Sequence, residues 1–134
     1  HLTKAWNQQA IVDNRGSVVD HLLATAATLK AGGARVERAD ALAWLDRASL
    51  DRSRQPFDLV FVDPPFDADL VPATLARLSD HGLLMPGGFC YVEMPRQGGL
   101  PPLPGGWSVH RSGVAGEVGY YLLHGMPRDL PRDV

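Results

Sequence analysis

A hydrophobic segment of the sequence ends on a carboxylic acid that is followed at once by a rigid turn. The segment, FDLVFVDPPF, ends with Asp63, Pro64, Pro65 and Phe66. A carboxylate can accept the hydrogens of a planar amine, and two prolines restrict the backbone so that a carbonyl group is aimed in advance. The aromatic ring offers a flat face on which a base can stack. These residues predict an acceptor site held by the preceding strand, although a plain turn that ends a strand would use the same residue types.

Two further acids occupy equivalent places in the chain. Asp13 ends the segment QAIVD, and Asp40 stands two residues after the segment ARVER. In open α/β sheets ligands bind beyond the carboxyl ends of the strands. Carboxylates at that edge can accept hydrogen bonds from the ribose hydroxyls and the adenine amine of a nucleoside cofactor. The third acid, Asp63, would lie beside the reacting group. A single acid at a strand end is more often a helix cap or a turn residue, so the prediction rests on the three together.

Strand-like and helix-like segments alternate along the chain. Apolar β-type runs predict strands at 9–13, 34–38, 58–63 and 88–94, and residues 107–125 predict two strands around a turn near Gly113 to Gly116. Apolar residues at helical spacing predict helices at 17–33, 39–48 and 68–82. This alternation indicates an α/β fold: a Rossmann-like, doubly wound, mostly parallel sheet with helices on both faces and a C-terminal antiparallel hairpin.

The Asp-Pro-Pro-Phe segment resembles the [DN]-P-P-[FYW] motif of class I S-adenosylmethionine-dependent methyltransferases that act on planar exocyclic nitrogens. Together with ATLKAGGARVERADALAWL, GFCYVEM and GEVGYYLL, it resembles the bacterial enzymes that methylate guanine N2 in small-subunit (16S) ribosomal RNA. The similarity runs over nearly the whole chain, from AIVDN to YYLL. Its most specific part is the succession of LKAG, DPPF and YVE at these separations.

The resemblance implies particular roles for the residues already singled out. Asp13, Asp40, Ala41 and Asp63 would contact the cofactor S-adenosylmethionine. The segment Asp63 to Phe66 would hold and orient the acceptor base. The partner would be ribosomal RNA or a small-subunit assembly particle, and the protein would act as a cytoplasmic monomer.

The sequence departs from the family at its beginning. Members begin with a basic RNA-contacting segment and a first strand that carries a glycine-rich D-x-F-x-G-x-G loop, and no such loop occurs in the sequence. Since that strand is central in the fold, we expect a fragment without its first strand. The expected organisation is a methyltransferase domain at 1–126, incomplete at its N-terminal side, and a tail at 127–134.

Composition excludes several other classes of protein. With 134 residues, 45% hydrophobic and 21% charged, the chain is the size of one globular domain, and no apolar run approaches a membrane span. A single cysteine, Cys90, excludes an internal disulfide and is expected to be a core residue rather than a nucleophile. No Cys/His spacing indicates a metal site. Trp44 and Trp107 are expected to pack the fold, and Glu93, which ends its strand as Asp63 does, to be a cap or surface charge.

Two rival functions remain open at this point. Related methyltransferases act on adenine N6 in DNA or on a glutamine amide in proteins, but they usually carry Asn-Pro-Pro-Tyr. The carboxylate at Asp63 favours guanine, because an acid can also accept from the ring N1–H that adenine lacks. A methyltransferase-like module that binds RNA or a protein without catalysis is the other rival, and the missing glycine loop favours it.

Overall fold

The computed structural model describes residues 9–13, 24, 34–63 and 70–125. The chain divides into two compact units, residues 1–55 and 56–134. Position 24 is helical, and the rest of the helix predicted at 17–33 lies outside the described residues. The expected domain boundary at 126/127 lies outside them as well. In the described parts of the chain, no helix combines the length and apolarity that crossing a membrane requires.

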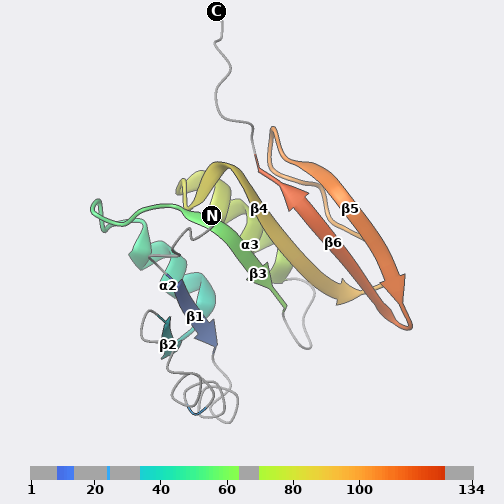
Figure 1. Cartoon of the computed structure of the whole chain (residues 1–134), viewed down its shortest axis with the longest axis horizontal. Helices are drawn as coiled ribbons and strands as arrows, with labels where there is room; N and C mark the ends of the chain where they lie inside the picture. Colours follow the sequence, from blue (N-terminus) through green and yellow to red (C-terminus); the bar gives the residue numbers. More distant parts are fainter. Residues whose placement is uncertain (1–8, 14–23, 25–33, 64–69, 126–134) are drawn as a thin grey trace, which may run out of the picture. The chain divides into compact units, whose positions relative to one another are not determined.

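The first unit contains a small parallel sheet. Strand β1 (Gln9–Asp13) pairs in parallel with β2 (Ala34–Arg38), and Asp13 lies opposite Arg38 at the carboxyl end of the ladder. Both strands have the bounds that their apolar runs predicted (Figure 1). No described strand pairs with the other edge of β1.

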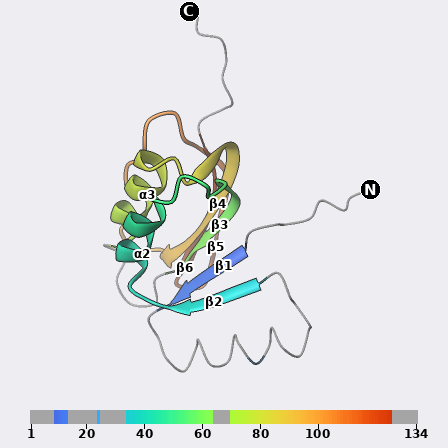
Figure 2. The same ribbon diagram turned by 90° about the vertical axis from the view of Figure 1, so that its left-hand side faces the viewer.

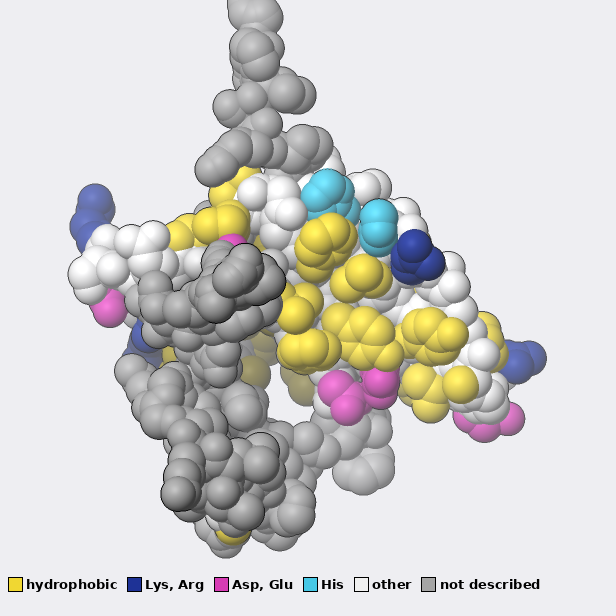
Figure 3. Space-filling view, in the orientation of Figure 1, with side chains coloured by type: hydrophobic (Ala, Val, Ile, Leu, Met, Phe, Trp, Pro, Cys, Tyr) yellow, Lys and Arg dark blue, Asp and Glu magenta, His cyan; other side chains and the backbone are white. Residues whose placement is uncertain are grey.

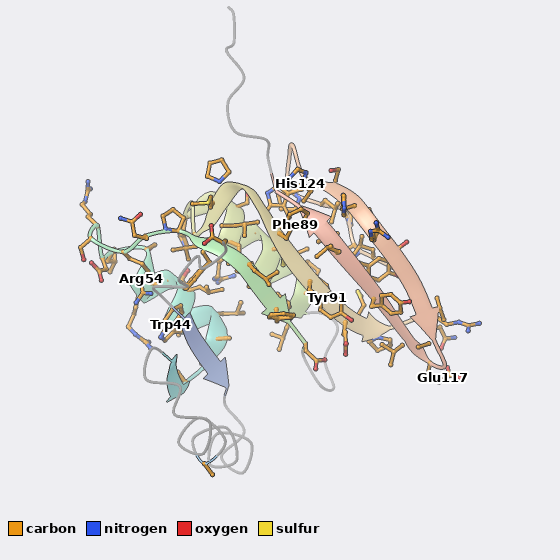
Figure 4. All side chains as sticks on the ribbon, viewed as in Figure 1. Trp44, Arg54, Phe89, Tyr91, Glu117 and His124 are labelled. Atoms are coloured by element: carbon orange, nitrogen blue, oxygen red, sulfur yellow. The ribbon has the colours of Figure 1, made fainter. Side chains whose placement is uncertain are left out.

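Helix α2 (Ala41–Ala48) follows β2 and begins at an acidic cap. The Asp40 carboxylate accepts hydrogen bonds from the N–H groups of Leu42 (3.0 Å) and Ala43 (3.4 Å), which satisfies two amides of the first turn. Trp44 is buried, and the Arg54 guanidinium lies 5.0 Å from the centroid of its ring (Figure 4). The expectation that Trp44 packs the fold is confirmed.

The second unit is a four-stranded mixed sheet with the order β3-β4-β6-β5. Its elements are β3 (Phe57–Val62), α3 (Leu70–Asp80), β4 (Leu84–Pro95), β5 (Ser108–Ala115) and β6 (Val118–His124). β3 and β4 are parallel, and β6 is antiparallel to both β4 and β5. The predicted parallel pair joined by a helix and the predicted C-terminal hairpin are both confirmed (Figure 1).

Helix α3 packs through one face and ends at a glycine. Val71, Leu75 and Leu78 recur at helical spacing and are buried. Pro72 lies in the first turn, where its missing N–H breaks no helical bond. Gly82 adopts φ 62°, so the Leu83 N–H can reach back to the Leu78 carbonyl at 3.0 Å and close the helix.

The two faces of β4 have different environments. Cys90, Val92 and Met94 are buried on one face, and α3 lies on one side of the β3–β4 pair (Figure 2). Burial raises the pKa of the Cys90 thiol to about 12, so this cysteine is a core residue, as expected, and not a nucleophile. On the other face, Phe61 of β3 is 70% exposed. Among the described residues, α3 is the one helix of this unit.

The hairpin turn falls later than the glycines suggested. The turn is formed by Gly116 and Glu117, whereas Gly113 lies within β5, opposite Tyr120. A Cβ at position 113 would collide with the phenol of Tyr120. Gly113 is therefore explained by the close approach of an aromatic side chain across the strands rather than by a turn.

Candidate active site

Asp63 stands directly after β3 and is exposed. In the parallel ladder, Phe61 lies opposite Tyr91 and Val62 lies opposite Val92. The next residues along the two strands are Asp63, directly after the end of β3, and Glu93, two residues before the end of β4. Neighbouring strands lie about 5 Å apart, so both carboxyl groups are within reach of one small ligand.

Three described side chains form a connected group at this edge. The Tyr91 hydroxyl donates a hydrogen bond of 2.9 Å to Oε2 of Glu93. The Phe61 and Tyr91 rings meet edge to face, with centroids 5.7 Å apart. Figure 4 shows Tyr91 on β4, and in Figure 3 acidic side chains border the hydrophobic ones on this face of the sheet. Aromatic faces and carboxylate acceptors therefore lie side by side.

The electrostatic state of Tyr91 links it to both acids. Its hydrogen bond to Glu93 raises the pKa of Tyr91 above its ordinary value, and the negative charges of Glu93 and Asp63 act in the same direction. The phenol therefore stays protonated at neutral pH and continues to donate to Glu93.

The predicted turn after Asp63 lies outside the described residues. Pro64, Pro65 and Phe66 belong to the segment 64–69, so their predicted roles stay predictions. Tyr91 and Glu93, which the structure brings beside Asp63, were not among the predicted site residues. The acid near the end of the second apolar run, GFCYVEM, was the one hint in the sequence, and it did not show which strand lies beside it.

The predicted cofactor residues of the first unit lie at one edge of the small sheet. The backbone of Asp13 lies opposite that of Arg38, and Asp40 follows two residues later. Asp40 caps α2 through Oδ1, so the cap role considered for it is observed. Ala41 is the first residue of that helix. Asp13 and Asp40 belong to one unit and Asp63 to the other, and the single cleft predicted for all three stays a prediction.

A parallel α/β arrangement with a C-terminal antiparallel hairpin is shared with class I methyltransferases of Rossmann type. Comparison with known proteins agrees with this class. The chain belongs to the family described as Conserved hypothetical protein 95, whose model matches residues 2–124.

Several relatives of this chain carry methyltransferase names. The chain is 39% identical over 112 residues to the ribosomal RNA small subunit methyltransferase D of Escherichia coli (strain K12), an alignment that covers 84% of the chain and 54% of that protein. The enzyme of the same name from Haemophilus influenzae is 32% identical over 83 residues, covering 58% of the chain and 42% of that protein. The chain thus spans about half the length of the curated relatives it matches.

Solved structures support the fold independently. The Escherichia coli protein yhhF, whose name marks its methyltransferase assignment as provisional, aligns with a TM-score of 0.78 and 36% identity over 91% of this chain and 66% of its own. An O-methyltransferase family protein from Burkholderia thailandensis aligns with a TM-score of 0.61 over 91% of this chain and 45% of its own. At 16% identity the second likeness shows the fold alone.

Proposed function

We propose that the protein transfers a methyl group from S-adenosylmethionine to the N2 amine of a guanine in small-subunit ribosomal RNA. The observation that carries this proposal is the exposed Asp63 at the carboxyl end of a parallel strand, in a chain 39% identical to a small-subunit rRNA methyltransferase. The partner would be ribosomal RNA or a small-subunit assembly particle, bound by a monomer in the cytoplasm.

The acids of the first unit fit the nucleoside half of this cofactor. Ribose hydroxyls and the adenine amine are hydrogen-bond donors, which match the carboxylates of Asp13 and Asp40. Asp40 is exposed, and its cap bonds use Oδ1. The N–H of Ala41 belongs to the first turn of α2, where amides lack helical partners and a ring nitrogen can accept from them. When bound, the cofactor supplies the methyl group.

The residues after β3 would orient the acceptor. A conjugated amine is a weak nucleophile because its lone pair is delocalised into the ring. Acceptors against its two hydrogens, the Asp63 carboxylate and the Pro64 carbonyl, favour the geometry in which the lone pair points out of the ring plane. The two prolines hold that carbonyl in place, and Phe66 would stack on the base. The target guanine must be unstacked, because its amine cannot reach a buried methyl donor from within a helix.

Replacing the target guanine by inosine is the direct test. Full-length protein is incubated with small-subunit RNA and labelled S-adenosylmethionine, and mass spectrometry locates the methylated nucleotide. Semi-synthetic RNA with inosine at that position lacks the N2 amine and is expected to accept no methyl group. Methylation of the inosine RNA would contradict the guanine-N2 proposal. Absence of transfer to any RNA would favour the protein-glutamine or the non-catalytic alternative.

Exchanging Asp40 separates its cap role from its cofactor role. Asn also caps helices well, so Asp40→Asn is expected to change the free energy of unfolding by only about 0.5 kcal/mol. Loss of the charge should weaken a hydrogen bond to the cofactor by about 0.5–1.5 kcal/mol, an increase in Kd of roughly 2- to 13-fold in calorimetry. The control is Asp80→Asn, at an exposed position at the end of α3. An unchanged Kd for Asp40→Asn would mean that Asp40 serves as a cap alone.

A further inference from the structure

We propose that Glu93, held by Tyr91, accepts the N1–H of the target guanine and thereby makes the site specific for guanine. This inference rests on the function proposed above and names the residue that recognises the base. Asp63 would orient the N2 amine that reacts, and Glu93 would accept a hydrogen bond from the neighbouring ring N1–H.

The strand register supplies the first step of the argument. Phe61 lies opposite Tyr91 in the parallel ladder, and the next residues of the same alternation are Asp63 and Glu93. The edge-to-face contact of the two rings shows that Phe61 and Tyr91 share one face of the sheet. The hydrogen bond from Tyr91 shows that Glu93 shares it too. Glu93 therefore lies on the face of Phe61 and Tyr91, and Asp63 follows directly after β3.

The Tyr91 hydroxyl supplies the second step, because it selects one orientation of a flexible side chain. Glu93 is half-buried, and its Oε2 receives the phenolic hydrogen at 2.9 Å. A carboxylate has acceptor capacity on both oxygens, so this bond positions the group without exhausting it. A surface charge that served only solubility would not need such a partner. Glu93 was expected to be a cap or surface charge, and the inference gives it the further role of a positioned acceptor.

The chemistry of the base supplies the third step. Guanine presents N1–H and the N2 amine side by side as donors, so two neighbouring carboxylates match that edge. Adenine has an unprotonated N1 at the corresponding place, whose lone pair would face the Glu93 carboxylate. Since an unpaired or repelled buried group is costly, this arrangement rejects adenine as well as attracting guanine.

The test combines a change in the protein with a change in the RNA. 2-Aminopurine keeps the reactive amine of guanine but has no N1–H. For the full-length protein, kcat/KM is measured with guanine or 2-aminopurine at the mapped target position, for the native protein and for Glu93→Gln. We expect the native protein to prefer guanine, and Glu93→Gln to reduce that preference by about 10-fold, because a hydrogen bond to a charged group becomes a hydrogen bond to a neutral one. An equal loss on both RNAs would overturn the inference.

One further variant and two matched controls separate the positioning of Glu93 from general damage to the protein. Tyr91→Phe removes the hydroxyl that holds Glu93. Like Glu93→Gln, it should lower the ratio of kcat/KM for guanine RNA to kcat/KM for 2-aminopurine RNA. Tyr121→Phe makes the same change on a residue opposite Val92, which is on the buried face, and should leave the preference unchanged. Glu117→Gln, in the exposed β5–β6 turn, should also have no effect. If the native protein methylates neither RNA, the proposed function itself fails. If it prefers guanine and Glu93→Gln leaves that preference unchanged, only the inference about Glu93 fails.

Discussion

Asp63→Ala is expected to lower kcat for methyl transfer by about 100-fold or more while leaving the affinity for RNA within a few-fold. Loss of one preorganised group that acts in the transition state has about this effect in other enzymes. The physical reason is that the carboxylate gains its full value only as the amine attains its reactive geometry. Single-turnover transfer from labelled cofactor, together with RNA titration, separates the two quantities.

Asp58→Ala is the matched control for this prediction. It makes the same substitution at an exposed position near the start of the same strand, away from the carboxyl edge where ligands bind. Native activity for Asp58→Ala and low activity for Asp63→Ala would locate the effect at the edge of the sheet. Full kcat in Asp63→Ala would refute the assigned role.

Leu75→Ala is expected to lower the free energy of unfolding by about 2–5 kcal/mol. Leu75 is 1% exposed and lies at the centre of the apolar face of α3, between Val71 and Leu78. Truncation removes buried methyl groups and leaves a cavity that the packed sheet cannot close fully. The measurement is urea unfolding of the cofactor-free protein, followed by circular dichroism.

Leu50→Ala supplies the corresponding control. Leu50 is 80% exposed, so the same loss of atoms removes little buried contact and should shift the unfolding free energy by less than about 0.5 kcal/mol. Equal destabilisation by the two variants would mean that the buried face of α3 is not the core of the second unit.

Local sequence signals were sufficient for most of the described elements. Continuous apolar runs predicted β1 and β3, and the helical spacing that ends at Gly82 predicted α3, because these patterns depend on residues close together in the chain. The start of β4 was less predictable. It begins at Leu84 rather than Gly88, and its pairing with β3 shifts register between Phe57 and Leu59.

The class of fold and the candidate acceptor site could be predicted from the chain alone, because Asp63 to Phe66 are consecutive residues with a distinctive chemistry. The place of Tyr91 and Glu93 on the face of Phe61 came from the fold. They come from a strand almost thirty positions further along the chain, and the parallel register that joins them to β3 leaves no local signal. Strand pairing is a long-range interaction, so it alone could turn an apparently ordinary surface acid into a positioned acceptor.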